Sequence, residues 1–368
     1  MIGIDAHVLG DKSGGNETYY RNLIRNFDEK LQEQMILFVN KGVDVSELNF
    51  KGQIVEIGSH NAFFRNFVEM PYLAWKYKLK CLHMQYFIPF VRPCPVVVTI
   101  HDISFEHFSD IFTKKEMFIQ KKLIPYAAKK SDKILTVSEF SKKDICEKYH
   151  IPEDKVVVTY NGKNSLFRKM DSTDSEKQAI LNKFQLPEEY ILYVGNIQPR
   201  KNLKRLLQAY VQYALENEDS KPLVIVGKKA WMYDSIFEEI KKNNLEERVY
   251  FTGYVEEEEL ISLYNIAMFF IYPSIFEGFG LPVLEAMSCG TPVITSNITS
   301  IPEVAGEACH MLDPFKVEAI KNALELFTKD ENLRNEYREK GLEQAKKFEW
   351  STTAKRTERV YVEVCEKR

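Results

Sequence analysis

The chain has 368 residues, 45% of them hydrophobic and 28% charged, and its formal net charge at pH 7 is -3. This length exceeds one ordinary hydrophobic core, so it predicts two globular domains, and the small net charge argues against a nucleic acid partner. The six cysteines are scattered without a C-x-x-C pair. That spacing predicts reduced thiols, no structural zinc and a cytoplasmic setting.

The first half alternates short apolar runs with longer helical patterns. We expect strands over residues 1–5, 34–39, 53–58, 81–85, 95–101, 132–138 and 155–160. The opening M-I-G-I-D is one of these strands and lacks the basic and apolar regions of a secretory signal. No apolar run approaches the roughly 20 residues that span a bilayer, so any membrane attachment is expected to be peripheral.

A polar stretch over residues 161–189 marks the expected seam between two domains. Beyond it, strands are expected over residues 190–195, 222–227, 248–254, 267–273, 291–296 and 308–312. Runs such as Y-I-L-Y-V-G are apolar on both sides of the pleat, as buried parallel strands are. We therefore predict an α/β fold of two doubly wound domains, 1–165 and 166–350, with a last helix at about 351–368 packing back on the first.

Two carboxylates, Glu277 and Glu285, flank a glycine-containing turn and the start of an apolar helix. Gly278 and Gly280 allow the backbone to approach a ligand closely, and Pro282 suits the first turn of a helix. The preceding strand places the loop at the carboxyl end of a sheet, where ligands bind. Carboxylates there could accept hydrogen bonds from sugar hydroxyls, but two glutamates alone fit a solvated surface loop better.

An ordered set of motifs resembles the retaining, nucleotide-sugar-dependent glycosyltransferases of family 4. The stretch 273–303 resembles their E-x7-E segment. The other matches are Gly14–Gly15 after the first strand, His101–Asp102 after V-V-V-T-I, S-E-F-S at 138–141, N-G at 161–162, G-N-I-Q-P-R-K-N at 195–202, F-T-G-Y-V at 251–255 and F-E-W at 348–350. The set covers nearly the whole chain. It implies the GT-B fold, in which two Rossmann-like domains have parallel sheets facing across a cleft.

The resemblance also implies roles for individual residues. Glu277 would hold hydroxyls of the transferred sugar and Glu285 the ribose of the nucleotide, while Arg200 and Lys201 would neutralise the leaving diphosphate. His101 would contact the donor sugar near the reacting centre, although a histidine at a strand end can also be purely structural. Further donor contacts would come from Gly14, Gly15, Gly195, Val255, Gly278, Phe279, Gly280 and Leu281. Gly14 and Gly15 would lie near the diphosphate or the acceptor.

Two positions depart from the family pattern. Lys163–Asn164 follows Asn161–Gly162 where the family often has Val-Asp, and His7 stands where related sequences often carry arginine. We assign His7 no firm role from the sequence.

The implied activity is transfer of a hexose, with retention, from a nucleotide diphosphate-sugar to a glycan or lipid-linked saccharide in surface polysaccharide or glycoconjugate synthesis. The D-A-H-V-L-G start and R-P-C-P-V-V-V-T-I-H-D resemble mannosyltransferases, which favours GDP-mannose. UDP-glucose or UDP-N-acetylglucosamine, or a non-catalytic GT-B scaffold subunit, are the alternatives. The sequence lacks D-x-D, so no metal or other cofactor is expected.

Residues 61–80 interleave aromatic residues with lysine and arginine, and residues 112–148 are rich in lysine. Such segments can lie on an anionic membrane surface. They fit equally a core-facing aromatic stripe with a solvated basic face. Peripheral contact with the inner face of the membrane is therefore a hypothesis, set beside a purely cytoplasmic location.

Overall fold

The structure, a computed structural model, describes residues 1–10, 14–58, 61–108, 113–171, 173–227, 238 and 240–366. The chain divides into two compact units. The first comprises Met1–Gly162 together with Phe348–Arg368, and the second comprises Lys163–Lys347. The sequence analysis placed the two boundaries a few residues further along the chain.

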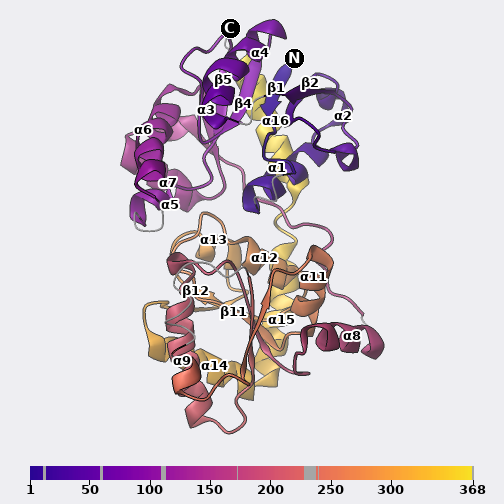
Figure 1. Cartoon of the computed structure of the whole chain (residues 1–368), viewed down its shortest axis with the longest axis vertical. Helices are drawn as coiled ribbons and strands as arrows, with labels where there is room; N and C mark the ends of the chain where they lie inside the picture. The colour runs from indigo at the N-terminus through magenta and orange to yellow at the C-terminus, as the bar shows by residue number, and fades with distance from the viewer. Residues whose placement is uncertain are drawn as a thin grey trace. The chain divides into compact units, whose positions relative to one another are not determined.

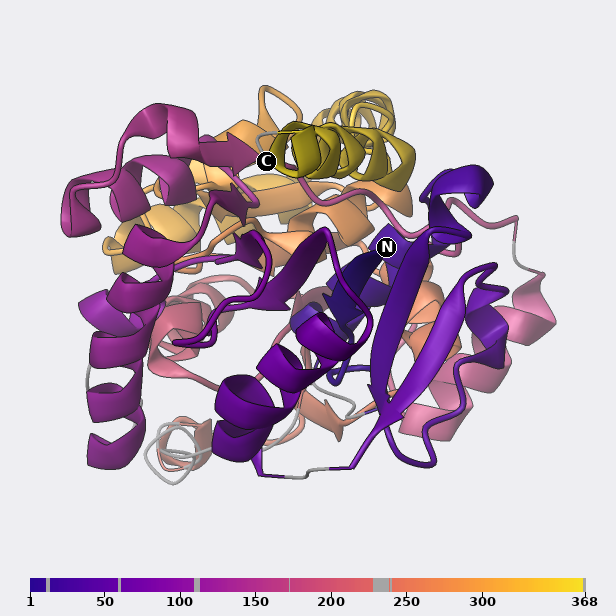
Figure 2. The same cartoon turned by 90° about the horizontal axis from the view of Figure 1, so that it is seen from above.

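Among the described residues, the first unit holds a seven-stranded parallel sheet in the order β3-β2-β1-β4-β5-β6-β7. Its strands are β1 (Ile2–Asp5), β2 (Met35–Asn40), β3 (Gln53–Ile57), β4 (Cys81–Gln85), β5 (Val96–Thr99), β6 (Lys133–Thr136) and β7 (Val156–Val158). Figure 2 shows β2 and β3 side by side at one edge. The direction of winding reverses between β1 and β4. Ligands bind at the carboxyl ends of strands beside such a reversal.

The helices of the first unit connect these strands or follow the last of them. They are α1 (Gly15–Arg25), α2 (Glu29–Gln32), α3 (Ala62–Phe64), α4 (Met70–Lys76), α5 (Ser104–His107), α6 (Lys114–Lys130), α7 (Glu139–Tyr149) and α16 (Trp350–Glu366). A π-helical turn, η2 (Arg65–Glu69), joins α3 to α4 without a break.

The second unit repeats the plan with a six-stranded parallel sheet among its described residues, in the order β10-β9-β8-β11-β12-β13. Its strands are β8 (Ile191–Val194), β9 (Leu223–Val226), β10 (Val249–Gly253), β11 (Phe269–Tyr272), β12 (Val293–Ser296) and β13 (His310–Leu312). Its helices include α8 (Asp174–Phe184), α9 (Leu203–Glu216), α11 (Glu257–Ile266), α12 (Leu281–Ser288), α13 (Ile301–Ala305), α14 (Val317–Lys329) and α15 (Glu331–Ala345). Here the winding reverses between β8 and β11.

The strands predicted from the sequence are all present, and their ends differ from the predicted ends by at most two residues. Strands β5 and β8 are buried along their whole length. That burial explains why their sequences are apolar on both faces, as a parallel sheet covered on both sides requires. Pro282 lies in the first turn of α12, as expected from its missing N–H.

The final helix α16 completes the core of the first unit, and Figure 1 shows it in yellow beside α1. It also contacts β4 and β6. The buried Tyr361 hydroxyl lies 2.6 Å from Nδ1 of His83, a β4 residue in the sheet interior. The last part of the chain is therefore structural material of the first unit rather than an appended tail.

Candidate active site

The loops that follow β8 and β11 meet in the second unit. These two strands are neighbours at the reversal of winding. A short 3-10 turn, η5 (Pro199–Lys201), follows β8, and the loop 273–280 connects β11 to α12. The Ile275 N–H donates to the Arg200 carbonyl over 2.8 Å, and the Ser274 Oγ, whose proton goes to Glu277, lies 2.9 Å from the same oxygen. The two loops thus form one hydrogen-bonded layer.

Glu277 is the centre of this layer. Its Oε1 accepts hydrogen bonds from Lys201 Nζ at 2.6 Å, the Ser274 hydroxyl at 2.6 Å and the Tyr272 hydroxyl at 2.8 Å. Its Oε2 accepts from Nη1 of Arg200 at 3.1 Å. Since a carboxylate offers about four acceptor positions, Oε1 is fully used and capacity for a further donor, such as a sugar hydroxyl, remains on Oε2.

The surroundings keep Glu277 ionised although its side chain is buried. Burial alone would raise the pKa of this carboxyl, but Lys201 and Arg200, with hydrogen bonds from Lys201 and Ser274, lower it to about 2. Lys201 is itself buried and lies over the ring of Tyr272, 5.0 Å from its centroid. One anion therefore holds two cations at the carboxyl edge of the sheet. This is an arrangement suited to binding a further anionic group.

Three residues that build this cluster were not identified from the sequence: Tyr272, Ser274 and Asn202. The Asn202 side-chain amide donates to the carbonyls of Pro273 and Pro314, at 2.9 and 2.7 Å, and so fixes the turn that carries Arg200. Tyr272 and Ser274 are two residues apart at a strand end, and alternation puts such side chains on one side. This spacing, with Glu277 close by in the sequence, was the pattern from which both residues could have been predicted.

The loop before α12 is held from outside by Ser300. Its hydroxyl donates to the Glu277 carbonyl at 2.8 Å and to the Phe279 carbonyl at 3.1 Å. Gly280 has φ 108°, and a Cβ there would lie 2.7 Å from Cδ1 of Ile301. The positive φ favours glycine at this position, and a larger residue would also have to displace the end of the Ile301 side chain. Gly278, Phe279 and Leu281 follow Glu277 in the same loop and at the helix start.

Glu285 lies one turn into α12 and has the opposite electrostatic character. Burial raises its pKa to about 7, partly offset by a hydrogen bond from the Tyr264 hydroxyl at 3.3 Å. The positive charge of Lys201 also lowers the pKa of Glu285. The two carboxyls of the E-x7-E segment are therefore distinct: Glu277 is a fixed anion, whereas Glu285 exchanges its proton near neutral pH.

The other predicted donor residues of the second unit lie at carboxyl ends of its strands. Gly195 directly follows β8, and its N–H donates to the Val226 carbonyl at 2.9 Å. Val255 follows β10 and is buried. Glu256 to Glu259 form a capping box at the start of α11, where acidic residues favour the helix dipole.

His101 follows β5 in the first unit and is partly exposed. Burial lowers its pKa to about 4, so the imidazole is neutral at pH 7. The Gln85 amide nitrogen lies 3.2 Å from His101 Nε2. The ring of Tyr19 meets His101 edge-on at 4.7 Å. Gly14, at φ 71°, caps α1, and Gly15 is the first residue of this helix.

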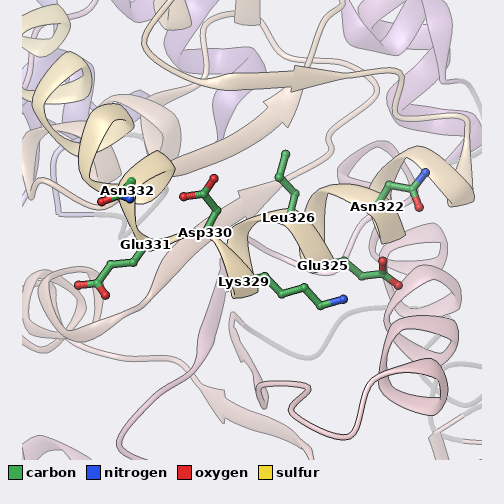
Figure 3. A pocket seen from close by; sticks show the side chains of 7 residues that line it. All are labelled: Asn322, Glu325, Leu326, Lys329, Asp330, Glu331 and Asn332. Atoms are coloured by element: carbon green, nitrogen blue, oxygen red, sulfur yellow. The ribbon is translucent and has the colours of Figure 1, made fainter.

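Among the described residues, no group of three His, Cys, Asp or Glu side chains is placed to hold a metal ion. A surface depression of about 660 Å³ lies elsewhere on the second unit, where α14 ends and α15 begins (Figure 3). Its lining residues are Asn322, Glu325, Leu326, Lys329, Asp330, Glu331 and Asn332. Their side chains spread along the helices without converging, and none of them belongs to the Glu277 cluster.

Two family models match the chain. The model described as Glycosyl transferases group 1 matches residues 174–344, and Glycosyltransferase Family 4 matches residues 13–164. O-antigen chain mannosyltransferase B of Escherichia coli is 37% identical over 266 residues, which cover 72% of this chain and 69% of that protein. The chain belongs to the group 1 glycosyltransferases. It is a transferase enzyme, and the family 4 resemblance seen in its motifs is confirmed.

Other relatives and structures agree with this assignment. The serotype-specific mannosyltransferase WbdA of Escherichia coli is 34% identical over 239 residues, which cover 64% of this chain and 29% of that protein. The glycosyltransferase chain thus spans less than a third of the length of WbdA. A sucrose-phosphate synthase from Thermosynechococcus elongatus superposes with a TM-score of 0.77 at 19% identity, over 100% of this chain and 99% of the other. The predicted GT-B fold is confirmed.

Proposed function

We propose that this glycosyltransferase moves mannose from GDP-mannose to a hydroxyl of a glycan or lipid-linked saccharide during surface polysaccharide synthesis. The names of two relatives, an O-antigen chain mannosyltransferase and a serotype-specific mannosyltransferase, support the sugar and the pathway class. The observation that carries the transfer chemistry is the Arg200–Lys201–Glu277 cluster at the reversal of the second sheet. It supplies fixed positive charge where a diphosphate would leave.

We further propose retention by front-face attack, in which the leaving diphosphate takes the acceptor proton. A double displacement would need a carboxylate nucleophile. Glu277 is poorly suited to that role, because four donors hold its oxygens and its pKa is lowered to about 2. A covalent sugar adduct on Glu277 in a trapped enzyme would refute this mechanism.

The donor is tested by binding and then by turnover. We expect GDP to raise the melting temperature more than UDP at equal concentration, and GDP-mannose to release nucleoside diphosphate faster than UDP-glucose or UDP-N-acetylglucosamine. A larger shift with UDP would replace the mannose proposal with the UDP-sugar alternative. If no donor and acceptor pair released nucleoside diphosphate, the result would instead favour a non-catalytic scaffold.

We propose that turnover needs no metal ion, because Arg200 and Lys201 supply the positive charge that a divalent cation provides in other transferases. Excess chelator is expected to leave the rate of nucleoside diphosphate release unchanged. Loss of turnover that added magnesium or manganese restores would contradict the proposal.

We also propose that the first unit contacts an anionic bilayer through an apolar patch. The patch consists of exposed side chains on α3, η2, α4 and the loop after β4: Phe63, Phe64, Val68, Tyr72, Trp75, Phe90 and Val91. Trp75 is 69% exposed, and Lys76 lies 6.0 Å from the ring centroid of Tyr72. Lys78 and Lys80 are exposed close by in the chain. Aromatic side chains beside lysines match the interface of a membrane with anionic lipids.

None of the described helices is long and apolar enough to cross a membrane, so the proposed contact is with one face. We expect the protein to sediment with phosphatidylglycerol vesicles at low salt, and a double substitution, Phe64→Ser with Trp75→Ser, to weaken this binding at least about tenfold. Phe315→Ser, which removes an exposed aromatic ring of the second unit, is the matched control. Wild-type protein that stays in the supernatant, or that dimerises through the patch instead, would refute the proposal.

A further inference from the structure

Arg65 is a buried arginine whose charge is poorly satisfied. It is 7% exposed and starts the π-helical turn η2 between α3 and α4. Within the described part of the chain, its Nε has no hydrogen-bond partner. The one carboxylate oxygen there within 4.0 Å of its guanidinium is Oδ2 of Asp5, at 4.0 Å. This distance is too long for a hydrogen bond.

Such an arrangement is costly unless it serves a purpose. A buried donor without a partner destabilises the folded state, and more strongly when the group is charged. Single π-turns inside helices are themselves uncommon and are frequent at functional sites. Arg65 begins the turn η2, and its Nε lies 4.0 Å from Oδ2 of Asp5 at the end of β1.

The groups around Arg65 form a polar cluster at the carboxyl end of β1. Asp5 is the last residue of β1 and is 1% exposed, and its Oδ1 accepts from His7 Nδ1 at 2.8 Å. The His7 side chain is 18% exposed, and its carbonyl accepts from the Asn40 amide at 2.8 Å, which fixes the turn. The Tyr20 hydroxyl is also buried without a partner in the described chain. Burial raises its pKa, and the nearby charge of Asp5 raises it further.

The position of this cluster is that of a ligand site. Strands β1 and β4 are the neighbours between which the winding of the first sheet reverses. Ligands bind outside the carboxyl ends of strands at such a point. The second unit uses the equivalent reversal for its Glu277 cluster. Because Asp5 already orients His7 through Nδ1, the Nε2 atom of the ring is the one left to meet a ligand.

We propose that Arg65 and His7, positioned by Asp5, bind an oxyanion group of the acceptor substrate, either a phosphate or a carboxylate. An oxyanion would give the guanidinium the hydrogen bonds that it lacks, in the planar paired geometry that arginine favours. The assignment to the acceptor rests on the proposed transfer function, since the donor diphosphate is matched by Arg200 and Lys201. The anion binding itself does not depend on that function.

The acidic neighbours do not prevent this binding. Asp5 is engaged by His7 through Oδ1, and its Oδ2 lies 4.0 Å from the Arg65 Nε. Glu69, four residues after Arg65, accepts through Oε1 from the Gly58 N–H at 2.9 Å, and its Oε2 is buried without a partner in the described chain. Neither carboxylate makes a hydrogen bond with Arg65 among the described residues, so the guanidinium keeps its capacity for an incoming anion.

The proposal is tested by calorimetric titration with methyl phosphate and, separately, with sodium acetate. The titrations use full-length protein carrying Arg200→Met, so that anions bound by the second unit are suppressed and no turnover is needed. We expect Arg65→Met to raise the Kd for the better anion at least tenfold and His7→Phe to raise it by a smaller factor. Lys355→Met, which removes an exposed lysine of the same unit, is expected to leave it unchanged. The tighter of the two anions identifies the acceptor group.

A stability measurement separates binding from folding. If Arg65 serves a ligand, Arg65→Met is expected to melt at the same or a higher temperature while losing the anion, because a buried unsatisfied charge is removed. Arg65→Lys keeps the positive charge but lacks the paired N–H groups of the guanidinium, so this variant should bind the anion more weakly than the parent. It tests the proposal even if the methionine variant fails to fold. Equal anion affinity in the Arg65 variants, or no anion binding by the Arg200→Met parent, would overturn it.

Discussion

Replacing Glu277 by glutamine is expected to lower kcat/KM at least about a hundredfold and to reduce the free energy of unfolding by about 3 kcal/mol. The carboxylate accepts from Lys201, Ser274, Tyr272 and Arg200, and removing its charge leaves two cations without their anion. The amide nitrogen of glutamine also presents donors where donors already point. Nucleotide release assays and urea unfolding measure the two effects separately.

The stabilisation that each of the two carboxyls provides depends on pH in a direction set by its pKa shift. The folded pKa of Glu277 is about 2, below its ordinary value of 4.5, so its stabilisation is present above pH 4.5 and is lost as the pH falls toward 2. Glu285 behaves oppositely: its folded pKa of about 7 means that its contribution is full below pH 4.5 and is lost as the pH rises toward 7.

Glu285→Gln is therefore the matched stability control. It replaces a carboxyl that is already partly protonated at neutral pH, so it should not destabilise the protein there. It should also flatten the stability profile between pH 4.5 and 7. Equal urea midpoints for Glu277→Gln and wild-type protein at pH 7 would show that the ion cluster does not stabilise the second unit.

Arg200→Met is expected to lower kcat by about a hundredfold to a thousandfold, with a smaller change in the KM of the donor. Arg200 is the more exposed of the two cations on Glu277, with 22% of its side chain accessible against 11% for Lys201. It is thus the better placed to meet a leaving diphosphate. A charge that develops in the transition state affects kcat more than ground-state binding.

Two variants separate catalysis from general electrostatics in this experiment. Lys204→Met removes an exposed lysine at the start of α9, four residues after Arg200, and should leave kcat unchanged. Arg200→Lys keeps the charge but loses the paired geometry, so it should recover part of the rate. A fall in kcat of similar size in Lys204→Met would mean that net charge, not the position of Arg200, limits the reaction.

The sequence was sufficient for the fold because strands such as β5, β8 and β11 are buried on both faces. Continuous apolar runs such as V-V-V-T and I-L-Y-V can be read without knowledge of partners, and the alternation with helices fixes parallel winding. It was also sufficient to select Arg200, Lys201 and Glu277, whose side chains the structure joins within 3.1 Å. These residues carry charge and sit beside glycine and proline in an ordered motif.

The supporting residues could not be read in the same way. Tyr272 looks like any buried aromatic residue of a strand, and Asn202 acts through side-chain contacts to Pro273 and Pro314, the latter more than a hundred residues away in the chain. The opposite pKa shifts of Glu277 and Glu285 depend on which neighbours surround each carboxyl. Arg65 was visible only as part of a basic and aromatic stretch, because neither its burial nor the π-turn that it begins follows from the local sequence pattern.

The place of α16 has a consequence for synthesis on the ribosome. Strand β4 and the His83 imidazole are made before the second unit, but the Tyr361 hydroxyl that hydrogen-bonds to that ring belongs to α16, which is made after it. The nascent first unit therefore lacks part of its core until α16 has been translated, whereas the second unit, which precedes α16, can finish folding beforehand. A premature stop before Trp350 would consequently damage the half of the protein that was translated first.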